Sequence, residues 1–171
     1  LEMPILDHDG DSEKINAWVV LCENHDWTDC TGFCIYCHDE CEHANVDKDG
    51  KCEICGLLIP VCLISADGTK VTYYTTLTAA FDAAQLADNT GCTVRLLTDG
   101  CIVNGKYMLS TGCFTLDLNG KTIQAGEKWR NDINKDVTAT ILITQDASVT
   151  FTGSGMVEPY VDLDDLSSGN G

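Results

Sequence analysis

A repeated pattern of histidine, aspartate, glycine and cysteine constrains the first third of this chain. Its two copies lie 18 residues apart and share the spacing H-x3-D-x2-G-x-C-x2-C. The first copy consists of His25, Asp29, Gly32, Cys34 and Cys37, and the second of His43, Asp47, Gly50, Cys52 and Cys55. Agreement at five positions indicates two copies of one small structural unit.

A cysteine precedes the histidine of each copy, which completes a set of one imidazole and three thiolates. Such a set fills a tetrahedral zinc shell. A C-x2-C pair places two sulfurs on one tight turn, and the glycine before the pair relieves the strain of that turn. We therefore predict two structural zinc ions, one held by Cys22, His25, Cys34 and Cys37 and the other by Cys41, His43, Cys52 and Cys55.

The second copy also matches the first half of an EF-hand loop. Asn45, Asp47 and Asp49 supply oxygens at positions one, three and five, and a glycine stands at position six. Glu53 at position nine could add an oxygen, but the twelfth position is a glycine instead of a bidentate glutamate. The sequence thus predicts at most a weak calcium site, formed by Asn45, Asp47, Asp49 and Glu53.

Composition excludes several classes of partner. The chain has 27 acidic and 10 basic residues, a formal net charge of −17, which repels nucleic-acid phosphates and anionic membranes. No stretch approaches the roughly 20 consecutive apolar residues that cross a bilayer. We expect neither nucleic-acid binding nor membrane insertion, and we expect any export signal or anchor to lie outside the given sequence.

The 171 residues suit one substantial core plus a small satellite. We expect an acidic arm over residues 1–16, a Cys/His-rich metal-binding module over 17–60, which includes a short buried strand or turn at 17–21, and a larger β-rich domain over 61–171. In that domain, residues 78–88 have helical periodicity, with Ala80, Phe81, Ala84 and Ala87 on one face and Thr76 or Thr78 as the N-cap.

Short apolar strands separated by glycine or asparagine turns fill the rest. We expect strands at 71–74, 92–98, 101–104, 107–110, 113–118, 121–125, 139–144 and 147–152. Residues 116–120 (LDLNG) correspond to residues 149–153 (VTFTG), and 126–138 reads as a protruding loop. Cys92, Cys101 and Cys113 are expected to be small apolar residues that face the core.

Regular short strands with glycine corners are typical of a solenoid, although a β-sandwich produces similar alternation. The helix favours the solenoid, because its apolar face can cover the open first coil. We therefore predict a mainly β fold: a zinc-knuckle-like module, then a short α-helix that caps a β-solenoid of about three coils, which the resemblance given next identifies as a right-handed parallel β-helix. The uncovered last coil is predicted to pair with another chain.

The segments YTTLTAAFDAA, TVRLLTDG, FTLDLNGKTI and VTFTGSG resemble the opening of a right-handed parallel β-helix of the pectate-lyase-like superfamily, as found in large surface proteins of gut Firmicutes. CEHANVDKDGKCEICG likewise resembles the Cys/His repeats that accompany such modules. The resemblance implies an extracellular or cell-surface protein with an adhesive or glycan-directed role, whose partner is a host or neighbouring-cell glycan or protein.

An exported protein leaves disulfides open as an alternative to zinc, but bridges give the two histidines no reason to recur. Eleven cysteines cannot all pair, and Cys30 and Cys62 are candidate spare ligands or bridge partners. We expect no catalysis, since four protein ligands close the zinc shell and Asp117 reads as a structural carboxylate. The alternatives are a polysaccharide lyase or glycoside hydrolase that lacks its catalytic coils, and a zinc-dependent protein-interaction module.

Overall fold

The computed structural model describes Gly32, residues 41–130 and residues 136–161. The chain divides into two compact units, one formed by His43–Glu53 and Leu58–Gly171 and the other by Leu1–Glu42 and Ile54–Leu57. All described strands and helices belong to the first of these, and none of these helices is long and apolar enough to cross a membrane. The strand or turn expected at 17–21 lies outside the described residues.

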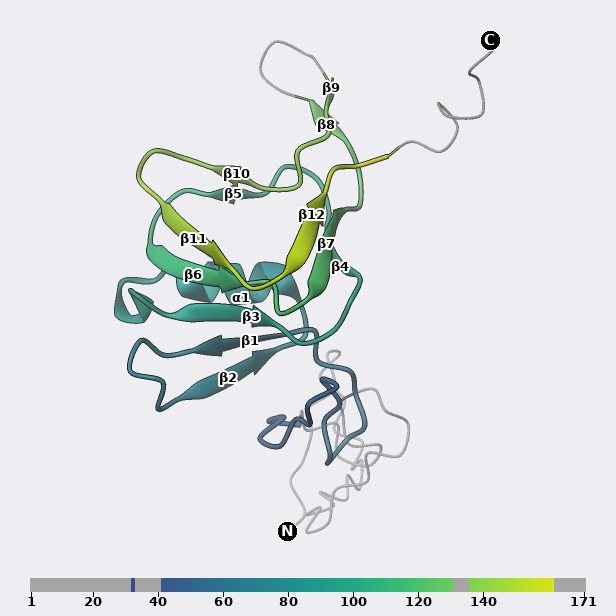
Figure 1. The fold of residues 1–171 in the computed structure, drawn as a ribbon, viewed down its shortest axis with the longest axis vertical. Helices are drawn as coiled ribbons and strands as arrows, with labels where there is room; N and C mark the ends of the chain where they lie inside the picture. The colour runs from purple at the N-terminus through teal and green to yellow at the C-terminus, as the bar shows by residue number, and fades with distance from the viewer. Residues whose placement is uncertain (1–31, 33–40, 131–135, 162–171) are drawn as a thin grey trace, which may run out of the picture. The chain divides into compact units, whose positions relative to one another are not determined.

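The largest sheet has the order β11-β6-β3-β1-β2 (Figure 1). It begins with an antiparallel hairpin of β1 (Val61–Ile64) and β2 (Val71–Tyr74), and β1 also pairs antiparallel with β3 (Thr93–Leu96). From there the pairing is parallel, first with β6 (Cys113–Asp117) and then with β11 (Ser148–Thr152). Parallel neighbours that are distant in sequence require the chain to return to the same side repeatedly.

Two further parallel ladders show the same return. β4 (Cys101–Val103), β7 (Lys121–Ala125) and β12 (Gly155–Glu158) form one sheet, and β5 (Met108–Leu109) pairs with β10 (Leu142–Ile143). We call each group of strands that follows in chain order a passage: β3, β4 and β5 form the first passage, β6, β7 and β10 the second, and β11 and β12 the third. Each strand therefore stacks on the strand that occupies the same place in the preceding passage (Figure 1).

The core consists of side chains that alternate inward along these ladders. Val94 pairs with Leu116, and Cys101 pairs with Ile123, and all four are buried. Successive side chains of a strand point to opposite faces, so in-register pairing aligns inward residues into columns. The sequence-based prediction of a mainly β domain with strands near these positions is confirmed.

The single α-helix of the described residues, α1 (Leu77–Ala84), packs against β1, β2, β3 and β4. Its N-cap is Thr76, whose Oγ1 accepts a hydrogen bond from Ala79 N at 3.2 Å. The buried face contains Phe81, whose ring lies 6.1 Å from the ring of Phe114. The predicted helix is confirmed, but it ends earlier than expected and a 3-10 turn follows at Ala87–Asn89, so Ala87 is exposed.

Three other expectations need correction. The segment 126–138 is not simply a loop, because β8 (Trp129–Arg130) and β9 (Asp136–Val137) form an antiparallel pair within it. Cys113 is exposed, since the inward positions of β6 are those of Phe114 and Leu116.

The internal repeat was aligned two residues out of register. Leu116 pairs with Phe151, not with Val149. The alignment matched the glycines of the two corners, but Gly120 is the third residue after β6 whereas Gly153 is the first residue after β11. A shift of two residues preserves which face is inward, so the predicted alternation survives the error.

The part of the chain from β1 to β12 is called the strand domain below. Residues 43–53 pack on it through Gly50. Its carbonyl accepts a hydrogen bond from Ile59 N at 2.6 Å, and Lys51 pairs with Leu58. Gly50 has φ +80°, and a Cβ atom there would lie 2.7 Å from Thr98 Cγ2 and 2.8 Å from the Ile59 carbonyl oxygen. Both the backbone conformation and the close approach require glycine.

Replacement of Gly50 by alanine is therefore expected to destabilise the protein more than the same change at Gly68, which has φ +72° but open space around it. Gly68→Ala should cost about 1 kcal/mol of unfolding free energy through backbone strain alone. Gly50→Ala should cost about 1–3 kcal/mol more, because the methyl group meets backbone and side-chain atoms. Urea titration followed by circular dichroism measures the difference, and equal losses would contradict this packing.

Candidate metal centre

The second copy of the repeat folds as a miniature hairpin. Val46 and Cys52 form an antiparallel bridge, and Asp47 N donates to the Lys51 carbonyl at 2.9 Å. Asp47 Oδ1 accepts hydrogen bonds from the backbone N–H groups of Asp49 and Lys51, both at 2.9 Å. This is the local chemistry by which aspartate closes a tight turn. The turn places Cys52 at the beginning of the C-x2-C segment.

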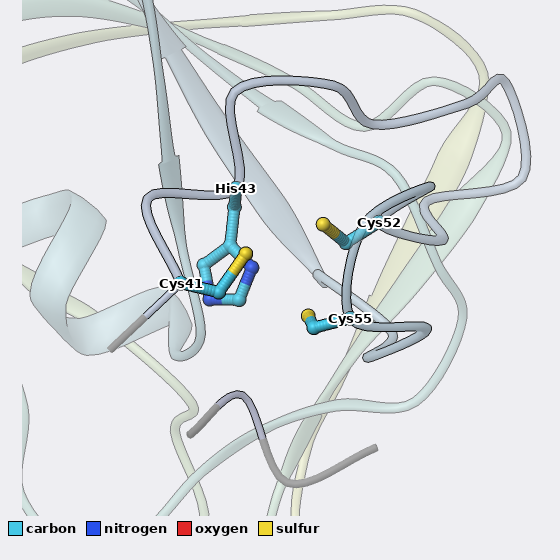
Figure 2. Close-up of side chains that lie close together, drawn as sticks. All are labelled: Cys41, His43, Cys52 and Cys55. Atoms are coloured by element: carbon cyan, nitrogen blue, oxygen red, sulfur yellow. The ribbon is translucent and has the colours of Figure 1, made fainter. Parts of the chain in front are cut away.

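Four side chains meet beside this hairpin: Cys41, His43, Cys52 and Cys55. One ligand atom from each, three sulfurs and one imidazole nitrogen, lies within 4.8 Å of all the others. Figure 2 shows the sulfurs of Cys52 and Cys55 turned toward the His43 ring and Cys41. Two donors come from the segment before the hairpin turn and two from the segment after it, so the group brings two stretches of chain together.

Unusual backbone conformations accompany the donors. His43 has φ +49°, and Gly56, directly after the C-x2-C pair, has φ +73°. A left-handed conformation is ordinary for glycine but costs roughly 1 kcal/mol or more for a histidine. It turns the chain sharply between Cys41 and Asn45, and the imidazole is brought into the group instead of continuing along an extended strand.

The group fits the requirements of a tetrahedral ion. Zinc–sulfur bonds of about 2.3 Å place tetrahedral donors about 3.8 Å apart, which falls within the observed limit of 4.8 Å. The four residues are 0–6% exposed, so water has little access to the centre. Three soft sulfurs and one imidazole select zinc-like metals over calcium or magnesium. With all four positions supplied by the protein, the group could hold one metal ion in a structural role.

The structure thus assembles one of the two predicted sets. The other set, Cys22, His25, Cys34 and Cys37, lies outside the described residues, as does Cys30. Two of the predicted calcium ligands take part in other contacts. Asp47 Oδ1 accepts the hydrogen bonds that close the turn, and the Asn45 carbonyl accepts a hydrogen bond from Glu53 N at 2.9 Å. The assignment of calcium to Asn45, Asp47, Asp49 and Glu53 stays a prediction.

The cysteines of the strand domain lie apart from this group. Cys62, Cys92 and Cys101 are buried free thiols, and Cys113 is an exposed one. Burial raises the pKa of the Cys101 thiol to about 11, and the Asp99 carboxylate adds to the shift. Burial also raises the pKa of Cys62, where the Arg95 guanidinium opposes the effect. Cys62 is therefore a poorly reactive thiol packed on the outer side of β1.

Asp117 takes part in an ion pair between neighbouring strands. Its Oδ2 lies 2.8 Å from Arg95 Nε, and its Oδ1 accepts a hydrogen bond from Asn119 N at 3.0 Å. Both oxygens therefore hold β3, β6 and the following corner together. The sequence analysis identified Asp117 as structural but missed its partner, Arg95. Arg95 lies 22 residues before Asp117 (117 − 95), which is one passage of the chain, and this spacing could have indicated the pair.

Comparisons with family models, with curated proteins and with solved structures gave no match.

Replacement of Cys52 by serine should remove one bound metal ion per chain, because it deletes a thiolate from a four-donor shell. The exposed thiol Cys113 offers a matched control, and Cys113→Ser should leave the metal content unchanged. Elemental analysis after gel filtration measures the ion, and the loss of a sulfur-to-cobalt charge-transfer band in cobalt-loaded protein provides a second readout. Equal metal content in wild type and Cys52→Ser would contradict the assignment.

The strand-domain thiols should differ sharply in reactivity. At pH 8 a thiol of pKa about 11 holds about one thiolate in a thousand, and burial also hinders access, so alkylation of Cys101 should be at least about 100-fold slower than that of exposed Cys113. Peptide mass spectrometry after timed iodoacetamide treatment measures both sites. In guanidinium the two rates should converge. Fast labelling of Cys101 in the folded protein would show that its site is open.

Proposed function

We propose that this chain is a non-catalytic structural segment of an extracellular surface protein, in which zinc stabilises a small Cys/His-rich module joined to a parallel β-helix. The observation that carries the proposal is the buried group of Cys41, His43, Cys52 and Cys55, whose four donors leave no position for a substrate. A closed shell of this kind contributes folding free energy instead of chemistry.

Zinc accounts for this group better than disulfides. A bridge would use two of the three sulfurs and would give the third sulfur and the imidazole no common role. A single cation satisfies all four donors at once, and it offsets the cost of the left-handed backbone at His43. The repeat in the sequence extends the proposal to a second zinc held by Cys22, His25, Cys34 and Cys37.

The β-helix is supported by the three parallel ladders. β3, β6 and β11 stack in one ladder, β4, β7 and β12 in a second, and β5 and β10 in a third. Strands that follow one another in the chain lie in different ladders, as in the coils of a solenoid. α1 contacts β3 and β4 of the first coil, which agrees with a capping role.

A surface role follows from the resemblance of the sequence to β-helical surface proteins, and we propose a host or neighbouring-cell glycan or protein as the partner. The engagement of both Asp117 oxygens with Arg95 and Asn119 supports the non-catalytic reading, because this carboxylate is committed to holding strands together. The net charge of −17 favours a partner that is neutral or basic over phosphate-bearing ones.

Metal and thiol measurements on protein purified without reductant test the proposal. We expect two zinc ions per chain, and we expect a chelator to release them and to speed amide hydrogen exchange over residues 43–59. The amides of β6 and β7 should keep their protection, which serves as the internal control. If the protein contains no metal and few titratable thiols, the cysteines form disulfides and the zinc proposal is wrong. If amide exchange does not change after zinc is released, the ion has no structural role.

A further inference from the structure

Two corners of the strand domain contain the same three residues, asparagine, glycine and lysine. They are Asn104-Gly105-Lys106, which follows β4, and Asn119-Gly120-Lys121, which leads into β7, and an aliphatic residue precedes each. Within the described residues, no other asparagine is followed by glycine. Because the local sequences match, a difference in reactivity between the two asparagines has to come from the fold.

An Asn-Gly pair can lose its side-chain amide without an enzyme, because glycine has no Cβ beside the attacking nitrogen. The glycine backbone nitrogen gives up its proton and attacks Cγ of the asparagine. A nitrogen–carbon bond forms, the Cγ–Nδ2 bond breaks, and Nδ2 takes up a proton and leaves as ammonia. Water then opens the resulting succinimide ring at either carbonyl, which yields aspartate or isoaspartate.

Both nitrogens of this reaction are hydrogen-bonded at Asn119. The attacking atom, Gly120 N, donates to the Ser154 carbonyl at 2.5 Å. The leaving atom, Asn119 Nδ2, donates to the Leu96 carbonyl at 2.9 Å, and Asn119 N donates to Asp117 Oδ1 at 3.0 Å. The attack requires these bonds to break together, so it is limited to moments when the corner opens locally.

The pair Asn104-Gly105 has no such bonds. In the part of the chain that the structure describes, neither the Asn104 side chain nor Gly105 N has a hydrogen-bond partner. Asn104 Oδ1 lies against Gly126, which has no side chain. No hydrogen bond therefore has to open before Gly105 N approaches the Asn104 amide.

Solvent access and charge do not separate the two sites. Both asparagines are exposed. Each pair also has one carboxylate beside it: Glu127 Oε1 lies 3.1 Å from the position of a Cβ atom at Gly105, and Asp117 Oδ1 accepts the hydrogen bond from Asn119 N. The hydrogen bonds at Asn119, and the left-handed backbone that they hold at φ +49°, are the differences that remain.

We infer that Asn104 is a site of spontaneous deamidation in the folded protein, and that the fold protects Asn119 from the same reaction. The product adds a negative charge to the corner after β4, beside Glu127, in a chain whose net charge is already −17. Isoaspartate also lengthens the backbone of this corner by a methylene group. Neither site involves the metal centre.

Incubation of the full chain with zinc in mildly alkaline buffer tests this inference. Trypsin cleaves after Arg95, Lys106 and Lys121, so Asn104 and Asn119 fall in separate peptides, 96–106 and 107–121. Mass spectrometry of timed samples measures the mass gain of deamidation in each peptide, and isomerisation of aspartate leaves the mass unchanged. The Asn104 peptide should be modified at least about tenfold faster, because the hydrogen bonds at Asn119 must open first.

Guanidinium provides the reference, since in the unfolded chain both Asn-Gly-Lys sequences should react at similar rates. Asn104→Gln is the matched variant: it keeps an amide, but the longer side chain forms the cyclic imide far less readily. Its 96–106 peptide should keep its mass, and the rate at Asn119 should not change. Equal rates at the two asparagines of the folded protein would overturn the inference, as would faster modification of Asn119 or an Asn104 that reacts only in guanidinium.

Discussion

The burial of three sulfurs and an imidazole, whose ligand atoms lie within 4.8 Å of one another, is the constraint on which residues 41–59 depend. Residues 41–59 have few apolar side chains, and their order comes from turns closed by Asp47, from the Gly50 contact and from the Cys/His group. A shared cation would give these elements a common anchor. The left-handed conformation of His43 indicates how far the backbone departs from its preferred geometry to supply the fourth donor.

The strand domain is held together differently, by repetition. Each passage buries its inward residues against the passage before it. On the outer face, polar side chains form contacts between neighbouring strands. Arg95 and Asp117 join two strands, and Asn119 Nδ2 donates to the Leu96 carbonyl at 2.9 Å, which joins the corner after β6 to the end of β3. No single contact dominates, because every passage of strands contributes its own contacts to the passage before it.

Much of this could be predicted because it is local. The donor spacing placed Cys41, His43, Cys52 and Cys55 in one group, and period-two alternation located the strands. Exposure of Cys113 was missed because a five-residue strand can be read in either phase until its neighbours are known. The sequence analysis also missed the end of α1, the β8–β9 pair and the register of Phe151. These features depend on tertiary contacts or on the geometry of the corners, and neither produces a periodic pattern in the sequence.

The passages of the chain differ in length. Val94 and Leu116 are 22 residues apart (116 − 94), whereas Leu116 and Phe151 are 35 apart (151 − 116), and the surplus includes the β8–β9 hairpin. The stack nevertheless stays in register on both sides of this excursion. The corner after β7 therefore tolerates length changes, so evolution or a protein engineer can vary what projects there without rebuilding the scaffold.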